Sequence, residues 1–206
     1  MKQLIAFLFL LVASSAIHAQ ERQVSLQAQL VNSKGTGNDL GYGVKTDVIL
    51  PLNDFLTAVA ELGWVVEPKT YIGDGHAFRG RAEVRLQPWR EYDQPFFVSA
   101  GGSFVHQRTS QYTKTAYNPT VAIGANIKAR AVLQYKHYFT ENRTPNRVGA
   151  SEFSGEVFIP FNDTRWLVRT GVSVINSRFS QPDGFVNAGR YSVWAFQAQA
   201  GFAYRF

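Results

Sequence analysis

The stretch Trp-Ala-Phe-Gln-Ala-Gln-Ala-Gly-Phe-Ala-Tyr-Arg-Phe, residues 194–206, decides the fold. Side chains of an extended strand alternate between its two faces, so this stretch has two contrasting sides. One side is apolar and aromatic and carries Trp194, Phe196, Ala198, Ala200, Phe202, Tyr204 and Phe206. The other side carries Gln197, Gln199, Gly201 and Arg205. The stretch therefore predicts an amphipathic strand that ends on an aromatic residue.

The opposite end of the chain predicts export. Lys2 supplies a charged start, residues 4–12 form a short apolar run, and Ala19 is a small residue before a cut at Gln20. We therefore expect a cleaved signal peptide over 1–19 and one mature domain over 20–206. The apolar run is too short for a spanning helix, so any membrane span in the mature chain must be built from strands.

Composition favours a strand-rich protein without covalent cross-links. The chain of 206 residues has no cysteine, 17 glycines and 14% aromatic residues. Such a balance of aromatic and turn-forming residues is typical of β-proteins. A net charge of +6 suits anionic lipid headgroups but is far from the signature of a nucleic-acid-binding protein.

Ten amphipathic segments can be read in order along the chain. They cover residues 22–32, 42–50, 56–67, 78–86, 96–107, 121–127, 131–139, 153–159, 166–174 and 194–206. The turn near Lys128 is the least certain boundary. Short turns such as 51–54 alternate with longer loops at 109–118, 141–150 and 177–190, an alternation that up-and-down membrane barrels show.

A repeat supports this register. Val-Ile-Leu-Pro-Leu-Asn-Asp at 48–54 matches Val-Phe-Ile-Pro-Phe-Asn-Asp at 157–163, and the strand count places both at short turns on the same side. Because the repeat was not used to choose the strands, it is an independent test of their order.

The apolar face of the ten strands carries no Lys, Arg, Asp or Glu, as expected if it contacts lipid, where an Arg or Lys at the bilayer midplane costs about 2–4 kcal/mol. Aromatic residues gather near the strand ends, as interfacial girdles do. One predicted girdle is Trp64, Phe78, Phe104, Phe139 and Trp194, and the other is Phe55, Phe96, Trp166 and Phe206. A soluble secreted barrel with its apolar face inward, binding a hydrophobic ligand, is the alternative.

The terminal stretch resembles the recognition signal of bacterial outer-membrane barrels, with Gln199, Gly201, Phe202, Tyr204 and Phe206 at the matching positions. The whole mature chain resembles the small bacterial outer-membrane β-barrel proteins. That resemblance implies a closed antiparallel up-and-down transmembrane barrel, an outer-membrane location and contact with the barrel-assembly machinery during biogenesis. Most members of the class have eight strands, so eight is the alternative to ten.

The face opposite the apolar one predicts a charged lumen. It gathers Lys45, Asp47, Glu61, Arg79, Arg81, Glu83, Arg85, Arg130, Lys136, Glu156 and Arg169. Buried charges must be paired, and a barrel of about ten strands is only slightly wider than one that its side chains fill. We therefore expect a plugged lumen with a mutually satisfied charge network. A narrow, weakly anion-preferring channel lined by Arg79, Arg81 and Arg85 is the alternative.

Catalysis and cofactor binding find little support in the sequence. His76, His106 and His137 remain after the leader, and Ser103 and His106 point to opposite faces of one strand. Neither a nucleophile elbow nor a metal-ligand spacing is present, so we predict no enzyme activity, no metal and no cofactor. A lipid hydrolase at the rim is the third possibility.

The predicted outer loops carry an excess of basic residues that suits lipopolysaccharide phosphates. The sequence therefore predicts a non-enzymatic outer-membrane barrel with a structural or surface-interaction role through these loops. Its expected partners are outer-membrane lipids and lipopolysaccharide, and no nucleic acid.

Overall fold

The computed structural model describes residues 22–34, 40–70, 73–87, 96–109, 113–127, 131–139, 147–161, 164–180 and 190–206. The predicted signal peptide over 1–19 and the predicted lumen residue Arg130 lie outside these ranges. Within them, no helix is long and apolar enough to cross a membrane.

Ten β-strands account for nearly all of the described residues. They are β1 (Gln23–Lys34), β2 (Leu40–Pro51), β3 (Leu56–Thr70), β4 (Gly73–Leu86), β5 (Phe96–Thr109), β6 (Thr113–Ile127), β7 (Ala131–Tyr138), β8 (Arg147–Pro160), β9 (Trp166–Ser180) and β10 (Arg190–Arg205).

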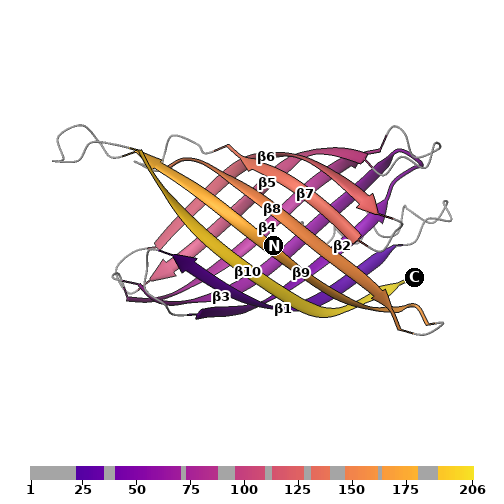
Figure 1. The fold of residues 1–206 in the computed structure, drawn as a ribbon, viewed down its shortest axis with the longest axis horizontal. Coiled ribbons are helices and arrows are strands. Elements are labelled where there is room, and N and C mark those ends of the chain that lie inside the picture. Colours follow the sequence, from indigo (N-terminus) through magenta and orange to yellow (C-terminus); the bar gives the residue numbers. More distant parts are fainter. Residues whose placement is uncertain are drawn as a thin grey trace.

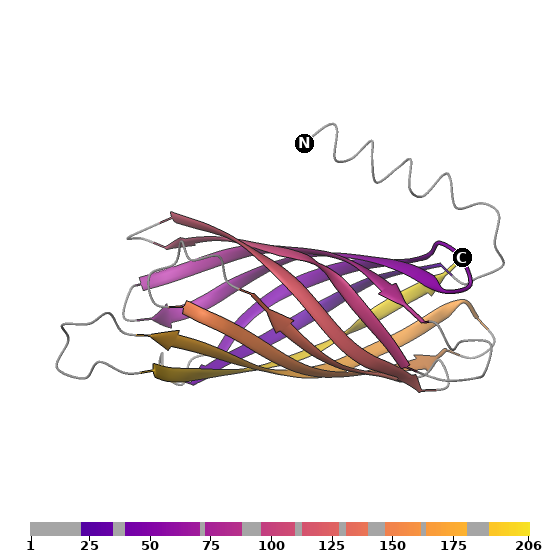
Figure 2. The same ribbon diagram turned by 90° about the horizontal axis from the view of Figure 1, so that it is seen from above.

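Each strand pairs antiparallel with its neighbours in sequence, and β1 pairs with β10 to close the barrel (Figure 1). The strands are tilted and wrap around the long axis, which Figure 2 shows from a second side. The segments on either side of Lys128 are two strands, because β6 and β7 pair antiparallel from Ile127 opposite Ala131 to Thr120 opposite Tyr138. The predicted count of ten is confirmed, and the alternative of eight is wrong.

The two ends of the barrel differ in which chain segments they hold. We call the end where β1 begins and β10 ends the terminal end, and the opposite one the distal end. Both copies of the seven-residue repeat leave their strands at the terminal end, the first between β2 and β3 and the second between β8 and β9, as predicted. In the first copy, Asn53 Oδ1 accepts hydrogen bonds from the N–H groups of Phe55 and Leu56 and so fixes the turn.

The predicted alternation of apolar and polar side chains determines which face of each strand points out of the barrel. Large apolar side chains lie on the outer surface, among them Leu26, Ile123, Val172 and Phe202, each more than 60% exposed. Polar side chains between them point inward and are buried, such as Gln27 at 1% exposed. A soluble barrel with an apolar interior is therefore not what this chain forms.

The predicted loops are shorter than expected. β5 runs to Thr109 and β6 begins at Thr113, so most of 109–118 is strand, and 147–150 and 177–180 belong to β8 and β9. β3 and β4 are separated by 71–72 alone, whereas β4 and β5, at the terminal end, are separated by 87–95. The predicted alternation of loop lengths is therefore wrong. Polar composition on both faces hid the distal strand ends, where hydrogen bonding continues beyond the apolar surface.

The predicted aromatic positions lie on the outer surface at two levels. Phe96 and Trp166 begin their strands at the terminal end, and Phe55 and Phe206 flank β3 and β10 there. Toward the distal end, Trp64 lies opposite Phe78 in the β3–β4 pairing. The other members of the distal set are Phe104, whose ring centroid is 5.6 Å from that of Phe78, Phe139 and Trp194. β3 continues past Trp64 to Thr70, so the strands extend beyond the distal aromatic level.

Two glycines mark places where the barrel wall leaves no room for a side chain. A Cβ at Gly201 would lie 2.0 Å from the carbonyl oxygen of Leu26 on β1. On the outer surface, the ring of Phe104 covers Gly80, where a Cβ would lie 2.1 Å from its Cε1 atom. Glycines of this kind let a sheet bend sharply, and an aromatic ring over the glycine restores the packing that it lacks.

Gly201→Ala should therefore destabilise the closing pair β1–β10, since overpacking a close backbone contact costs about 1–3 kcal/mol. Ala200→Val is the matched control, because Ala200 is the neighbouring residue and is exposed on the outer surface. We expect the gel-mobility shift on heating, which reports unfolding of a detergent-folded barrel, to occur at a lower temperature for Gly201→Ala only. Equal transition temperatures for both variants would contradict the close contact.

Candidate functional site

The interior of the barrel gathers the charged residues. The structure places ten of the eleven predicted lumen residues on inward-facing positions of β2, β3, β4, β7, β8 and β9. They are Lys45, Asp47, Glu61, Arg79, Arg81, Glu83, Arg85, Lys136, Glu156 and Arg169. Most of these side chains are less than about a quarter exposed, so their charges are held away from bulk water.

Arg169 on β9 is the centre of one group of ion pairs. Its Nη1 atom lies 2.6 Å from Asp47 Oδ2, and its Nη2 atom lies 2.5 Å from Glu156 Oε2. Nη1 also donates to Ser25 Oγ at 2.9 Å. The guanidinium stacks 5.1 Å above the ring of Phe158. One side chain thus ties β9 to β2, β8 and β1 through bidentate, charge-assisted contacts, the strongest kind of ion pair.

Glu83 on β4 is the centre of a second group. Its carboxylate lies 2.9 Å from Arg85 Nη2, 3.2 Å from Lys136 Nζ and 3.7 Å from Arg81 Nε. Glu83 and Lys136 are 3% and 1% exposed. Because β4 and β7 are not neighbours in the sheet, the Lys136–Glu83 pair spans the lumen.

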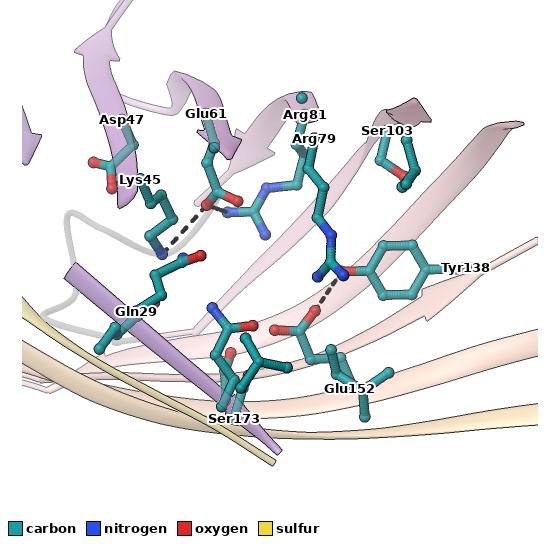
Figure 3. Close-up of a pocket in the computed structure, with 18 of the residues that line it drawn as sticks. Gln29, Lys45, Asp47, Glu61, Arg79, Arg81, Ser103, Tyr138, Glu152 and Ser173 are labelled. Atoms are coloured by element: carbon teal, nitrogen blue, oxygen red, sulfur yellow. Dashed lines mark hydrogen bonds and ion pairs between the residues drawn. The ribbon is translucent and has the colours of Figure 1, made fainter. Parts of the chain in front are cut away.

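Glu61 and Lys45 join these two groups. Glu61 Oε2 accepts from Arg81 Nη2 at 3.0 Å and lies 3.5 Å from Lys45 Nζ (Figure 3). Lys45 Nζ in turn lies 3.7 Å from Glu156 Oε1, a partner of Arg169. The result is one connected set, which we call the ion-pair belt: Lys45, Asp47, Glu61, Arg81, Glu83, Arg85, Lys136, Glu156 and Arg169.

Apolar side chains fill the lumen toward the terminal end. Phe158, Leu167 and Ala203 form a buried cluster, with Val132 packed against it. Phe97, 2% exposed, lies on the same level near the start of β5 and supports the guanidinium of Arg85 at 4.9 Å. We call these five residues the apolar plug. The ion-pair belt lies directly on its distal side, so the two together narrow the lumen.

A cavity of about 840 Å³ occupies the lumen, and its wall runs from Ile49 and Val132 near the terminal end, past residues of the ion-pair belt, to Gln107 and Ser177 near the distal end. All ten strands contribute to its wall. Figure 3 shows charged side chains of β3 and β4 facing the neutral Gln29 and Ser173 across it. Nine charged side chains belong to its wall, and seven of them are members of the ion-pair belt.

Sequence reasoning missed several residues of this interior. Tyr138 Oη donates to Glu152 on the cavity wall, and Gln27 Nε2 donates to Asp47 Oδ2 at 3.0 Å. The signal for Glu152 was present, since it precedes Glu156 by four residues on the same strand face. It was overlooked because the predicted strand began at Phe153.

The predicted insertion-signal residues have structural contacts of their own. Gln199 Nε2 donates to Glu156 Oε1 at 2.5 Å, so Gln199 supports the ion-pair belt. The rings of Trp166 and Tyr204 meet edge to face at 5.0 Å, and the N–H of Phe206 donates to the carbonyl of Arg22. Gly201 fits the close backbone contact with β1. Their role in recognition by the assembly machinery stays a prediction.

Three histidines lie on the outer surface. His106 Nδ1 contacts Thr115 Oγ1 at 2.8 Å, while Ser103 faces the lumen, as the sequence predicts. His137 Nδ1 lies 3.2 Å from Ser151 Oγ, a pair that the sequence analysis missed because Ser151 fell outside the predicted strand. His76 is exposed, and the side chain of Asp74 lies outside the described residues. In the part of the chain that the structure describes, no group of three His, Cys, Asp or Glu side chains could hold a metal ion.

Comparisons with known proteins add structural likeness only. No model of a protein family and no curated protein matches the sequence. Among solved structures, the chain is similar to the translocator domain of the autotransporter NalP from Neisseria meningitidis, with 12% identity, a TM-score of 0.46 and coverage of 100% of this chain and 95% of that one. It is also similar to OprG from Pseudomonas aeruginosa, at 12% identity and a TM-score of 0.40 over 93% and 98% of the two chains. The chain is likewise similar to Neisserial surface protein A, with 12% identity and a TM-score of 0.40 over 90% of this chain and 97% of that one.

The class of the protein follows from its own geometry. The sheet is closed, so the barrel has no strand edge, and its outer surface is apolar between two aromatic levels. Only a closed barrel can cross lipid with strands, because every backbone hydrogen bond must be made internally. The chain forms a closed ten-stranded antiparallel barrel with the build of an integral membrane β-barrel.

Arg169→Met should test the ion-pair belt. Removing this cation leaves Asp47 and Glu156 buried without it, and breaking a buried pair in this way costs about 3–5 kcal/mol. Arg178→Met on the exposed surface of the same strand is the control and should change stability by less than about 0.5 kcal/mol. Urea unfolding of the detergent-folded proteins, followed by tryptophan fluorescence, measures both. Equal stability of the two variants would show that the belt is not a unit.

Proposed function

We propose that this protein is a non-enzymatic outer-membrane barrel whose lumen is held closed, so that its interactions take place at the distal end and on the lipid surface. The observation that carries the proposal is the ion-pair belt. Its contacts Arg169–Asp47, Lys45–Glu156 and Lys136–Glu83 join strands that are not neighbours in the sheet. Side chains that cross the lumen and satisfy one another leave little room for a continuous water column.

The orientation in the membrane follows from the export signal expected over 1–19. Barrels of this class place both termini on the periplasmic side, so the terminal end faces the periplasm and the distal end faces outward. Arg108 and Arg178 are exposed near the distal ends of β5 and β9. These cations support contact with lipopolysaccharide phosphates.

A passive channel is the second candidate, and the cavity of about 840 Å³ favours it. Arg79, Arg81 and Arg85 all line that cavity, as a weakly anion-selective passage would require. Arg81 and Arg85 are, however, paired with Glu61 and Glu83. Arginines that are paired with carboxylates contribute more to the stability of the fold than to ion selectivity. This difference distinguishes the closed barrel from the channel.

Planar-bilayer recording of the purified full-length barrel tests the proposal. We expect no steady conductance from protein that shows the heat-dependent gel shift, because the ion-pair belt and the apolar plug close the lumen. Reproducible unitary conductance steps that scale with salt would overturn it.

The variant Arg79→Ser/Arg81→Ser/Arg85→Ser separates the two candidates further. If the arginines are part of a closed network, the variant unfolds at lower temperature or lower urea. If they line an open passage, the reversal potential in a salt gradient moves from anion toward cation preference while stability is retained.

The absence of enzyme activity is also part of the proposal. Within the described chain, Ser151 contacts His137 and Tyr135, and no carboxylate belongs to that set. A serine nucleophile needs a base that a third group orients. Overproduction of the protein should therefore leave the lipid A profile by mass spectrometry identical to that of Ser151→Ala. A deacylated species seen only with the unchanged protein would establish a rim hydrolase.

A further inference from the structure

We propose that the cavity in the lumen binds a neutral, hydroxyl-rich ligand, a mono- or disaccharide, on a row of uncharged polar side chains that crosses four neighbouring strands. The row consists of Gln134 on β7, Ser154 on β8, Ser173 on β9 and Gln197 on β10, and we call it the amide–hydroxyl row. The inference goes beyond the closed barrel proposed above. It does not depend on whether the lumen conducts ions, because the row belongs to the cavity wall in either case.

The pairing of the strands makes the row continuous. Gln134 lies opposite Ser154, and Ser154 lies opposite Ser173. Ser173 in turn lies opposite Gln197. Adjacent strands are about 4.8 Å apart, so four hydrogen-bonding side chains follow one another at short intervals across the wall. Figure 3 shows Ser173 together with Gln29 of β1, on the side of the cavity that faces the charged groups of β3 and β4.

The row has hydrogen-bonding capacity that the described part of the protein does not use. Gln134 is 5% exposed, and its Nε2 atom has no hydrogen-bond partner among the described residues. The side chains of Ser154, Ser173 and Gln197 likewise have no partner within that part of the chain. A buried amide that stays unpaired is costly, so an occupant of the cavity, water or ligand, has to supply the missing partner.

The charged groups on either side of the row are already paired. On its terminal side Glu156 contacts Arg169 and Lys45, and on its distal side Glu152 accepts a hydrogen bond from Tyr138. A charge on the ligand would need a further counter-charge in this buried space, whereas a neutral ligand needs none. The groups that remain are amides and hydroxyls, which offer both donors and acceptors. Ligand hydroxyls match them because a hydroxyl also donates and accepts.

Apolar side chains are interleaved with the row along the same wall. Ile175 follows Ser173 by two residues on the inner face of β9, and Ala195 lies opposite Ile175. Val132 precedes Gln134 in the same way on β7. A saccharide ring carries C–H and O–H groups side by side, so it matches such a wall. A ligand with one polar end and one apolar end does not.

The size of the cavity fits this ligand class. Pockets that hold small molecules have volumes of about 300–1,000 Å³, and this one measures about 840 Å³. Two sugar rings fit within that volume. The wall continues to Gln107 and Ser177 near the distal end, so polar groups are also present beyond the row.

Isothermal titration of the full-length barrel with glucose, galactose, maltose and lactose tests the proposal. The barrel is kept in lipid nanodiscs, because maltoside detergents present the same chemical groups as the probes. The permethylated form of the saccharide that binds is the matched ligand, since it keeps the ring frame and the neutral charge but has no O–H donor. We expect saturable binding of at least one saccharide and at least ten-fold weaker binding of its permethylated form. Failure of all four saccharides to bind, or equal binding of the permethylated form, would overturn the proposal.

Matched variants locate the site. Gln134→Leu removes an unpartnered buried amide from the row, and Gln23→Leu removes one from β1 that does not belong to the cavity wall. Gln134→Leu should weaken saccharide binding about three- to ten-fold, whereas Gln23→Leu should leave it unchanged. Ser173→Ala should weaken binding as well, and its control is Ser99→Ala, since Ser99 is as buried as Ser173 but lies outside the wall. Unchanged affinity in both Gln134→Leu and Ser173→Ala, or equal losses in their controls, would refute the row as the site.

The gel-mobility shift on heating shows whether each variant is folded. If Gln134→Leu does not fold, the comparison of Ser173→Ala with Ser99→Ala decides. Conductance together with saccharide binding would refute the closed lumen but not this site. Absence of both conductance and binding would refute this site alone.

Discussion

The hydrogen bonds between β1 and β10 are the constraint on which the rest of the structure depends. They run from Gln23 opposite Arg205 to Lys34 opposite Trp194 and leave no strand of the sheet with a free edge. A backbone group without a partner in lipid costs several kcal/mol, so a membrane barrel must close over its full height. Closure also fixes which side chains face lipid, because the same alternation that exposes Leu26 and Phe202 turns Gln27 and Gln199 inward.

Closure of the sheet leaves a space inside the barrel, and the ion-pair belt fills part of that space. A ring of ten strands encloses a space somewhat wider than the interior that side chains fill in an eight-stranded barrel. Here apolar side chains pack toward the terminal end and long side chains cross the middle to a partner, and a cavity remains along the lumen. Where the backbones of two strands approach too closely for a Cβ atom, the residue is glycine, as at Gly201 beside Leu26. The belt and the glycines are thus two consequences of one geometry.

The sequence predicted the strands best where one face was apolar and the other polar. β2, β4 and β9 show this pattern clearly, and their inward residues, such as Arg81 and Arg169, are where the alternation placed them. The prediction was wrong at the distal strand ends, which were read as loops. There the outward side chains also become polar, as at Thr115, because the strands continue past the lipid. Glu152 and Ser151 were missed for the same reason, although both lie on regular positions of β8.

The sequence by itself determined the local alternation, the number of strands and the sorting of charged from apolar faces, because each depends on residues two positions apart on one strand. Only the tertiary structure decided which charges meet. Arg169 and Asp47, or Lys136 and Glu83, lie on strands that are far apart in the chain, and their distance depends on the tilt and register of the closed sheet. The cavity in the lumen has the same origin. Period-two alternation tells which residues face inward, whereas the space left between them is a property of the whole ring.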